Sequence, residues 1–232
     1  MAEDFEIEDA PVRSDEPESP IFRIKNRLAK NEGYSTNMYL DKKGLITVGI
    51  GFRIDPISLM SPFKSKWIVH ETKRRATDKQ VELEWNRVKK LTPGKVPKFY
   101  QQKDGTHLDL PKWTINIEFA RRVDEMLNSL RQQFRENKNV DFDRLPLLIQ
   151  EAVSDLAWNA GWNNFTGKTD PETRKVIGWP KLSDAISEGL WDEAAFQTMR
   201  KGEEISDKRR YEFRDRILEE LHISLWRVQR QR

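Results

Sequence analysis

Two carboxylic acids and a hydroxyl, Glu32, Asp41 and Thr47, occur close together, with eight residues between the first pair and five between the second. Glycoside hydrolysis commonly uses two carboxyl groups, one as a general acid and the other as a base or nucleophile. Each residue also has an ordinary explanation, as a helix-end charge, a turn former and a strand residue. The trio is therefore a candidate catalytic site whose meaning depends on its surroundings.

A helix is predicted immediately before Glu32. Ser19 is a suitable N-cap, and Pro20 suits the first helical position. Gly33 can adopt the positive φ that often closes a helix. One face of this helix is apolar, formed by Ile21, Ile24 and Leu28. Glu32 would then lie near the negative end of the helix dipole, which favours a protonated carboxyl group, as a general acid requires.

A hairpin is predicted to carry the other two residues. Residues 38–40 and 45–48 have the composition of short strands, and residues 41–44 have that of a turn in which Gly44 takes a positive φ. Asp41 would lie at the mouth of this hairpin, and Thr47 on its returning strand.

The trio belongs to a longer pattern, E-G-x5-Y-x-D-x2-G-x2-T-x-G-x-G. Its fixed positions are Glu32, Gly33, Tyr39, Asp41, Gly44, Thr47, Gly49 and Gly51. The pattern closely resembles the catalytic stretch of the T-even phage type of lysozyme, glycoside hydrolase family 24. This resemblance implies that Glu32 protonates the leaving oxygen, that Asp41 activates a water and that Thr47 helps to position it, with inversion at the anomeric carbon.

One position departs from that family. The T-even members follow the last glycine of the motif with His, whereas this chain has Phe52. Pesticin-like bacteriocin toxins share the lysozyme fold and also diverge around the motif. The departure leaves open whether the chain lies nearer to those toxins, to virion-borne lysozymes or to lysis enzymes.

The resemblance continues more loosely after residue 112. An amphipathic pattern over residues 113–134 is similar to the long helix that joins the two lobes of phage lysozymes. Farther on, Trp158 and Asn159 match a segment that borders the sugar cleft in the family, and Gln197 matches a polar substrate contact. Trp158 also has the simpler interpretation of a core aromatic residue.

Two segments lie outside the pattern. Residues 1–18 hold eight acidic residues and one basic residue, so the rest of the 232-residue chain carries +10 against an overall charge of +3, and this acidic tail is expected to be disordered. Residues 56–110 form a Lys-rich insertion with Trp67 and Trp85. Its aromatic and basic residues are typical of a sugar-binding cleft extension, of a solvated helix face with anchoring tryptophans, or, less often, of a nucleic-acid binder.

Composition narrows the chemistry further. There is no cysteine, so disulfides and thiolate sites are excluded. The three histidines, His70, His107 and His222, are far apart in the sequence, and we expect no metal and no cofactor. No apolar run approaches the ~20 residues of a membrane span, and the first residues do not have the pattern of an ordinary secretory signal.

The sequence thus predicts a mostly helical α+β chain with a two-lobed lysozyme-like fold. The predicted domain covers residues 19–232, with an N-terminal lobe at 19–112 that contains a small β-hairpin, a connecting helix at 113–137 and a helical lobe at 138–232. The resemblance implies a muramidase that cuts the β-1,4 bond between N-acetylmuramic acid and N-acetylglucosamine. The alternative is a catalytically idle wall-binding or structural module of a virion or secretion machine.

Partners and location follow from this reading. Peptidoglycan strands are the expected partner of a monomeric protein, without nucleic acid or a membrane span. The protein would be made in the cytoplasm and act on the periplasmic cell wall. Its delivery route stays open, and a holin, a virion, a secretion machine or an immunity protein is each a candidate partner.

Overall fold

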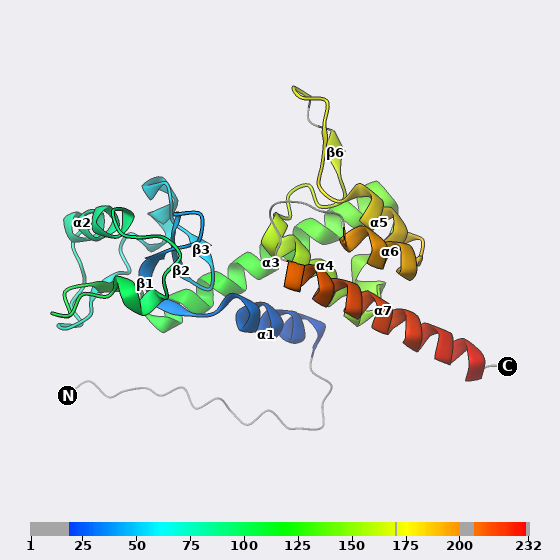
Figure 1. The fold of residues 1–232 in the computed structure, drawn as a ribbon, viewed down its shortest axis with the longest axis horizontal. Helices are drawn as coiled ribbons and strands as arrows, with labels where there is room; N and C mark the ends of the chain where they lie inside the picture. Colours follow the sequence, from blue (N-terminus) through cyan, green and yellow to red (C-terminus); the bar gives the residue numbers. More distant parts are fainter. Residues whose placement is uncertain (1–18, 170, 200–206, 231–232) are drawn as a thin grey trace.

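The structure, a computed structural model, describes residues 19–169, 171–199 and 207–230. The predicted acidic tail at residues 1–18 lies outside this part of the chain. Figure 1 shows two groups of elements joined by one long helix, α3 (Lys112–Lys138), with helix α1 (Pro20–Glu32) alongside the junction. The predicted fold class, mostly helical α+β with a long connecting helix, is confirmed.

Helix α1 begins and ends where the sequence predicts. The Ser19 side chain accepts a hydrogen bond from the backbone N–H of Phe22, Pro20 occupies the first turn, and Gly33 follows the last residue with a φ of 73°. Ile24 and Leu28 are buried, whereas Ile21 is 39 % exposed. The buried side of α1 packs on α4 (Leu147–Ala160) of the helical lobe.

The sheet of the N-terminal lobe is larger than the predicted hairpin. Strands β1 (Ser35–Leu40), β2 (Ile46–Gly49) and β3 (Phe52–Arg53) form an antiparallel meander. Two strands of the insertion, β4 (Ile68–Val69) and β5 (Leu108–Asp109), extend it on the other side of β1, giving the order β3-β2-β1-β5-β4. The insertion is therefore part of the same sheet as the motif.

The remaining insertion residues cover this sheet. They form the 3-10 helices η1 (Ile57–Phe63) and η2 (Pro97–Tyr100) and the helix α2 (Asp78–Lys89), which starts at a capping box between Thr77 and Gln80. Trp67 is fully buried, and the indole N–H of the partly buried Trp85 donates to the Ile54 carbonyl at 3.0 Å. Both tryptophans therefore anchor the lobe, and neither lines either of the two cavities described below.

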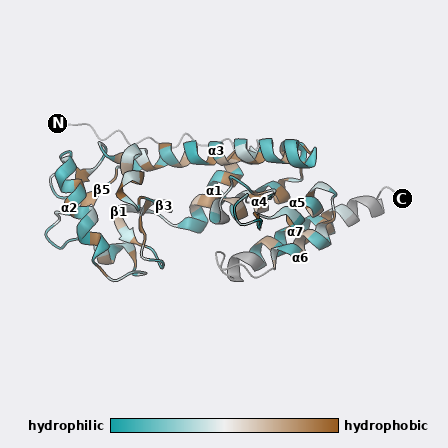
Figure 2. Cartoon of the chain, turned by 90° about the horizontal axis from the view of Figure 1, so that it is seen from above, coloured by the Kyte–Doolittle hydropathy of each residue, from teal (hydrophilic) through white to brown (hydrophobic). Residues whose placement is uncertain are grey.

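Helix α3 supplies the core between the lobes. The amphipathic pattern predicts a buried stripe, and its larger apolar residues include Phe119, Val123, Met126, Leu127, Leu130 and Phe134. Figure 2 shows both hydrophobic and hydrophilic residues on this helix, and the buried ones recur at helical spacing, as expected for an amphipathic helix. Asn139 ends it in the left-handed conformation.

The C-terminal lobe is helical. After η3 (Phe142–Arg144) and α4, a hairpin of β6 (Lys168–Thr169) and β7 (Val176–Ile177) projects from the lobe (Figure 1). Helices α5 (Pro180–Ser187), α6 (Trp191–Thr198) and α7 (Asp207–Arg230) complete it. Within the described ranges, none of the helices combines the length and apolar composition needed to cross a membrane.

Candidate active site

Glu32 is the last residue of α1, and its carboxyl group reaches Gly51 in the turn between β2 and β3. A β-carbon added to Gly51 would lie 3.0 Å from Oε2 of Glu32, closer than side chains normally pack. Gly51 also has a φ of +72°, which favours glycine. The motif glycine thus provides both the turn and the space that the Glu32 side chain occupies.

Asp41 follows β1 and organises the turn that the sequence predicts. Its Oδ1 accepts hydrogen bonds from the backbone N–H groups of Lys43 and Leu45, both at 2.8 Å. Gly44 takes the expected positive φ of 75°. The other carboxylate oxygen of Asp41, Oδ2, makes no hydrogen bond within the described part of the chain, so it can accept one from water.

Thr47 lies on β2, as predicted, opposite Tyr39 in the strand register. Its side chain is nearly buried, with 5 % of the residue exposed, and its hydroxyl donates to the Leu45 carbonyl at 3.2 Å. The remaining lone pairs of the hydroxyl can accept hydrogen bonds.

Tyr39 connects the two carboxyl groups electrostatically. Burial raises the pKa of Tyr39 to about 12, and the negative charges of Glu32 and Asp41 add to this rise. A charge acts on a neighbouring pKa chiefly at short range. Both carboxyl groups therefore act electrostatically on the same phenol.

A buried carboxylate fixes the end of α1 near this site. Asp155 on α4 is fully buried, and it accepts hydrogen bonds from Nδ2 of Asn31 at 3.2 and 3.3 Å. The guanidinium of Arg27 lies 3.5 Å from the same carboxylate. These contacts join the last turn of α1 to the helical lobe directly beside Glu32, and no pattern in the sequence marks Asp155.

A cavity of 710 Å³ lies between the two lobes, and Gly51 forms part of its wall. Both lobes contribute lining residues, among them Lys43, Arg53, Arg122, Trp158, Asn159 and Trp162. The indoles of Trp158 and Trp162 stack with their ring centroids 5.9 Å apart. The cavity thus combines an aromatic wall, three cations and the glycine against which Glu32 packs.

The predicted substrate contacts are only partly assembled. Trp158 and Asn159 line this cavity. Gln197 lies on α6, is 4 % exposed and donates a hydrogen bond to the carboxylate of Glu193. The structure does not bring Gln197 to the cavity.

Phe52, which replaces the histidine of the resembling family, is a core residue. It is fully buried and stacks on Phe63 at 5.9 Å, while the guanidinium of Arg122 lies 4.6 Å from its ring centroid. Arg122 also forms an ion pair with Glu118. Phe52 thereby supports a cation of the cavity wall. No sequence signal marked Arg122, because it lies on a helix that was interpreted as structural.

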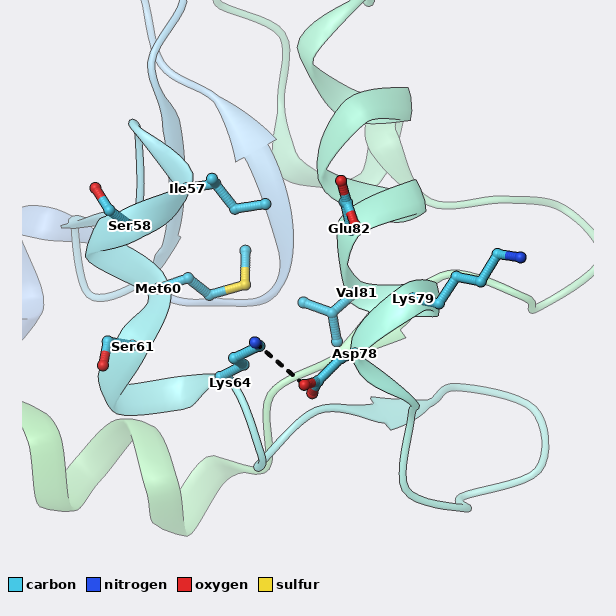
Figure 3. A pocket seen from close by; sticks show the side chains of 9 residues that line it. All are labelled: Ile57, Ser58, Met60, Ser61, Lys64, Asp78, Lys79, Val81 and Glu82. Atoms are coloured by element: carbon cyan, nitrogen blue, oxygen red, sulfur yellow. Dashed lines mark ion pairs between the residues drawn. The ribbon is translucent and has the colours of Figure 1, made fainter.

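A second cavity, of 830 Å³, lies between η1 and α2 (Figure 3). Ile57 and Met60 point into it from η1 and Val81 from α2, and Lys64 pairs with Asp78 at 3.1 Å along its edge. Glu32, Asp41 and Thr47 line neither cavity, and of the eight motif residues only Gly51 lines one, in the wall of the inter-lobe cavity. This second cavity is therefore separate from the motif.

Two of the three histidines, His70 and His107, come together in the fold. Their rings stack with centroids 4.3 Å apart, next to Asp109. The sequence could not show this, because strands β4 and β5, which bring the two residues together, are separated by the whole of α2.

Comparisons with known proteins assign no function to the site. No family model matches the chain, and no curated protein is similar enough to count as a relative. A solved structure that resembles it is the active form of the P1 phage endolysin Lyz, with a TM-score of 0.49, 14 % identity and 88 % of each chain covered. This likeness is too distant to carry an argument about function.

Proposed function

We propose that this chain is a muramidase, which hydrolyses the β-1,4 bond between N-acetylmuramic acid and N-acetylglucosamine in peptidoglycan. Glu32 acts as the general acid that protonates the leaving oxygen. Asp41 acts as the general base that activates a water on the opposite face of the sugar, and Thr47 helps to hold that water. The reaction inverts the anomeric carbon.

One observation carries this proposal, the contact of the Glu32 carboxyl group with Gly51 in the wall of the inter-lobe cavity. A general acid must reach the scissile bond of a bound substrate. In this arrangement, a glycan in the cavity would lie next to the motif acid. A glycoside hydrolase also needs a second carboxyl group, and Asp41, whose charge adds like that of Glu32 to the rise in the pKa of Tyr39, is the candidate.

The walls of the cavity suit the substrate. The stacked indoles of Trp158 and Trp162 offer flat apolar faces for sugar rings. The cations Lys43, Arg53 and Arg122 attract an anionic polymer such as the cell wall.

The geometry of Asp41 supports its role as the base. Two backbone N–H groups hold Oδ1, so the carboxylate has a fixed orientation. Oδ2 is left to bind water. Inverting glycosidases separate their two carboxyl groups by about 6.5–9.5 Å to admit such a water.

Product analysis tests this proposal. Purified peptidoglycan is digested with the protein, and the reducing ends of the soluble fragments are identified by mass spectrometry. We expect N-acetylmuramic acid at every new reducing end, with the α-anomer appearing first by NMR. Reducing N-acetylglucosamine, or wall binding without release of fragments, would contradict the muramidase, and the latter would identify an idle wall-binding module.

An initial β-anomer would leave the muramidase in place but contradict inversion, because it would make Asp41 or another group a nucleophile. Asp41→Asn is the matched variant for this step. It keeps the size of the side chain and should lose most of the activity, since an amide cannot take up the proton of the attacking water.

A further inference from the structure

His70, His107 and Asp109 lie on one face of the β4–β5 ribbon because of the strand register. Ile68 pairs with Asp109 and Val69 with Leu108. The N–H of His70 donates to the carbonyl of His107 at 2.9 Å, which continues the ladder by one pair. Side chains alternate along a strand, so His107 and Asp109 share a face, and directly opposite residues are neighbours.

The three side chains have metal-ligand chemistry at short range. One ligand atom from each, two imidazole nitrogens and a carboxylate oxygen, lies within 4.8 Å of the other two. Ligand atoms around a tetrahedral zinc ion lie about 3.3 Å apart. The trio therefore has to close by only about 1.5 Å, which small side-chain rotations provide.

The buried ring of His107 is not fully hydrogen-bonded. The residue is 3 % exposed, and neither nitrogen of its ring makes a hydrogen bond of ordinary geometry. A buried polar group without a partner is costly and calls for an explanation.

The other two residues complete the requirements of a metal site. The second oxygen of Asp109, Oδ1, accepts a hydrogen bond from the Thr36 hydroxyl at 2.8 Å, and such outer contacts orient ligating carboxylates. The side chain of His70 is 45 % exposed, which provides a path for an ion from solvent. Its Nδ1 lies 2.5 Å from Oδ2 of Asp109, a contact that a shared ion would replace.

We propose that His70, His107 and Asp109 bind a divalent transition-metal ion of the zinc class, with water completing the coordination. Imidazole suits Zn²⁺, whereas Mg²⁺ and Ca²⁺ prefer oxygen ligands. The ion would connect β4 and β5 and, through Thr36, strand β1 of the active-site sheet. Its role is structural, and the inference is independent of the proposed muramidase activity.

Metal titration of the full chain, without an affinity tag and after dialysis against a chelator, tests this site. We expect one equivalent of Zn²⁺ by calorimetry and, with Co²⁺, the visible absorption of a four-coordinate ion. Saturating Zn²⁺, at 100 times the Kd, should raise Tm by about 5–10 °C. Mg²⁺ should neither bind in the calorimeter nor raise Tm.

Variants assign the ligands. His70→Ala and Asp109→Asn should each abolish the Co²⁺ spectrum and the Tm shift, and Thr36→Val should weaken zinc binding about 10–100-fold. The control is His222→Ala, which removes the histidine of α7 and should bind like the wild type. Absence of zinc binding in the wild type, or unchanged binding in folded His70→Ala and Asp109→Asn proteins, overturns the proposal and leaves a His70–Asp109 ion pair only.

Discussion

The Glu32 carboxyl group packs directly against Gly51, and a β-carbon there would lie 3.0 Å from its Oε2. Any larger residue at position 51 must displace the carboxyl group or the turn. The first and last residues of the motif, Glu32 and Gly51, thus pack against each other in the folded chain.

Gly51→Ala should therefore abolish most of the peptidoglycan hydrolysis, while it lowers the free energy of unfolding only modestly. The positive φ alone costs of order 1–3 kcal/mol for a residue with a side chain, and the contact with Oε2 moves the Glu32 carboxyl group out of place. Denaturant unfolding and peptidoglycan hydrolysis, measured on the same preparation, separate the two effects.

Gly189→Ala is the matched control, because Gly189 has a φ of +69° but only an ordinary contact, at 3.9 Å with Trp191. It should lose similar stability and keep its activity. Equal activity of the two folded variants would show that Gly51 has no steric role in the site.

Trp158→Ala should weaken substrate binding. The indole lines the cavity and packs edge-on against Phe119 with ring centroids 5.5 Å apart. An aromatic contact is worth about 0.5–1.5 kcal/mol, so KM should rise about three- to tenfold with little change in kcat. Trp158→Phe should recover part of this loss, whereas a fall in kcat alone would exclude a binding role.

Tyr39 gives the site a signature at alkaline pH. Because burial and the charges of Glu32 and Asp41 raise its pKa to about 12 from the ordinary 10.0, the folded protein keeps its proton where the unfolded chain releases it. Stability from this group is complete below pH 10 and is lost as pH rises through about 12. Ultraviolet titration should show a tyrosine that ionises near pH 12 and that Tyr39→Phe removes; a Tyr39 that ionises near pH 10 would contradict its burial beside the two carboxylates.

Trp67 should prove essential to the N-terminal lobe. Its side chain is fully buried, so Trp67→Ala should lower the free energy of unfolding by about 3–5 kcal/mol. Trp113 is 54 % exposed and has Lys66 over its ring, so Trp113→Ala should cost about 1 kcal/mol or less. Comparable losses in chemical denaturation would refute this assignment of core and surface.

Features determined by neighbouring residues could be predicted from the sequence. The N-cap at Ser19 and the positive φ of Gly33 and Gly44 follow from local backbone chemistry. The stripe of α3 follows from helical periodicity. The fold class and the elements that carry Glu32, Asp41 and Thr47 were accessible in this way.

Features that depend on contacts between residues far apart in the sequence could not be predicted in this way. Nothing near residue 70 indicates that it faces residue 107, because two-residue strands carry almost no pattern of their own. The burial of Asp155 beneath α1 and the approach of Arg122 to Phe52 likewise arise only when the lobes pack. Gln197, which was assigned by resemblance alone, is not among the residues that line the cavity.

Glu32→Gln is the most direct test of Glu32 as the general acid of a muramidase. The amide keeps the size of the side chain but cannot donate the proton that the leaving oxygen needs. We expect Glu32→Gln to fold with an unchanged Tm and to release no soluble fragments from purified peptidoglycan. The control is Glu188→Gln, a change at an exposed carboxyl group of the helical lobe, which should remain fully active. Near-normal hydrolysis by folded Glu32→Gln would contradict the account.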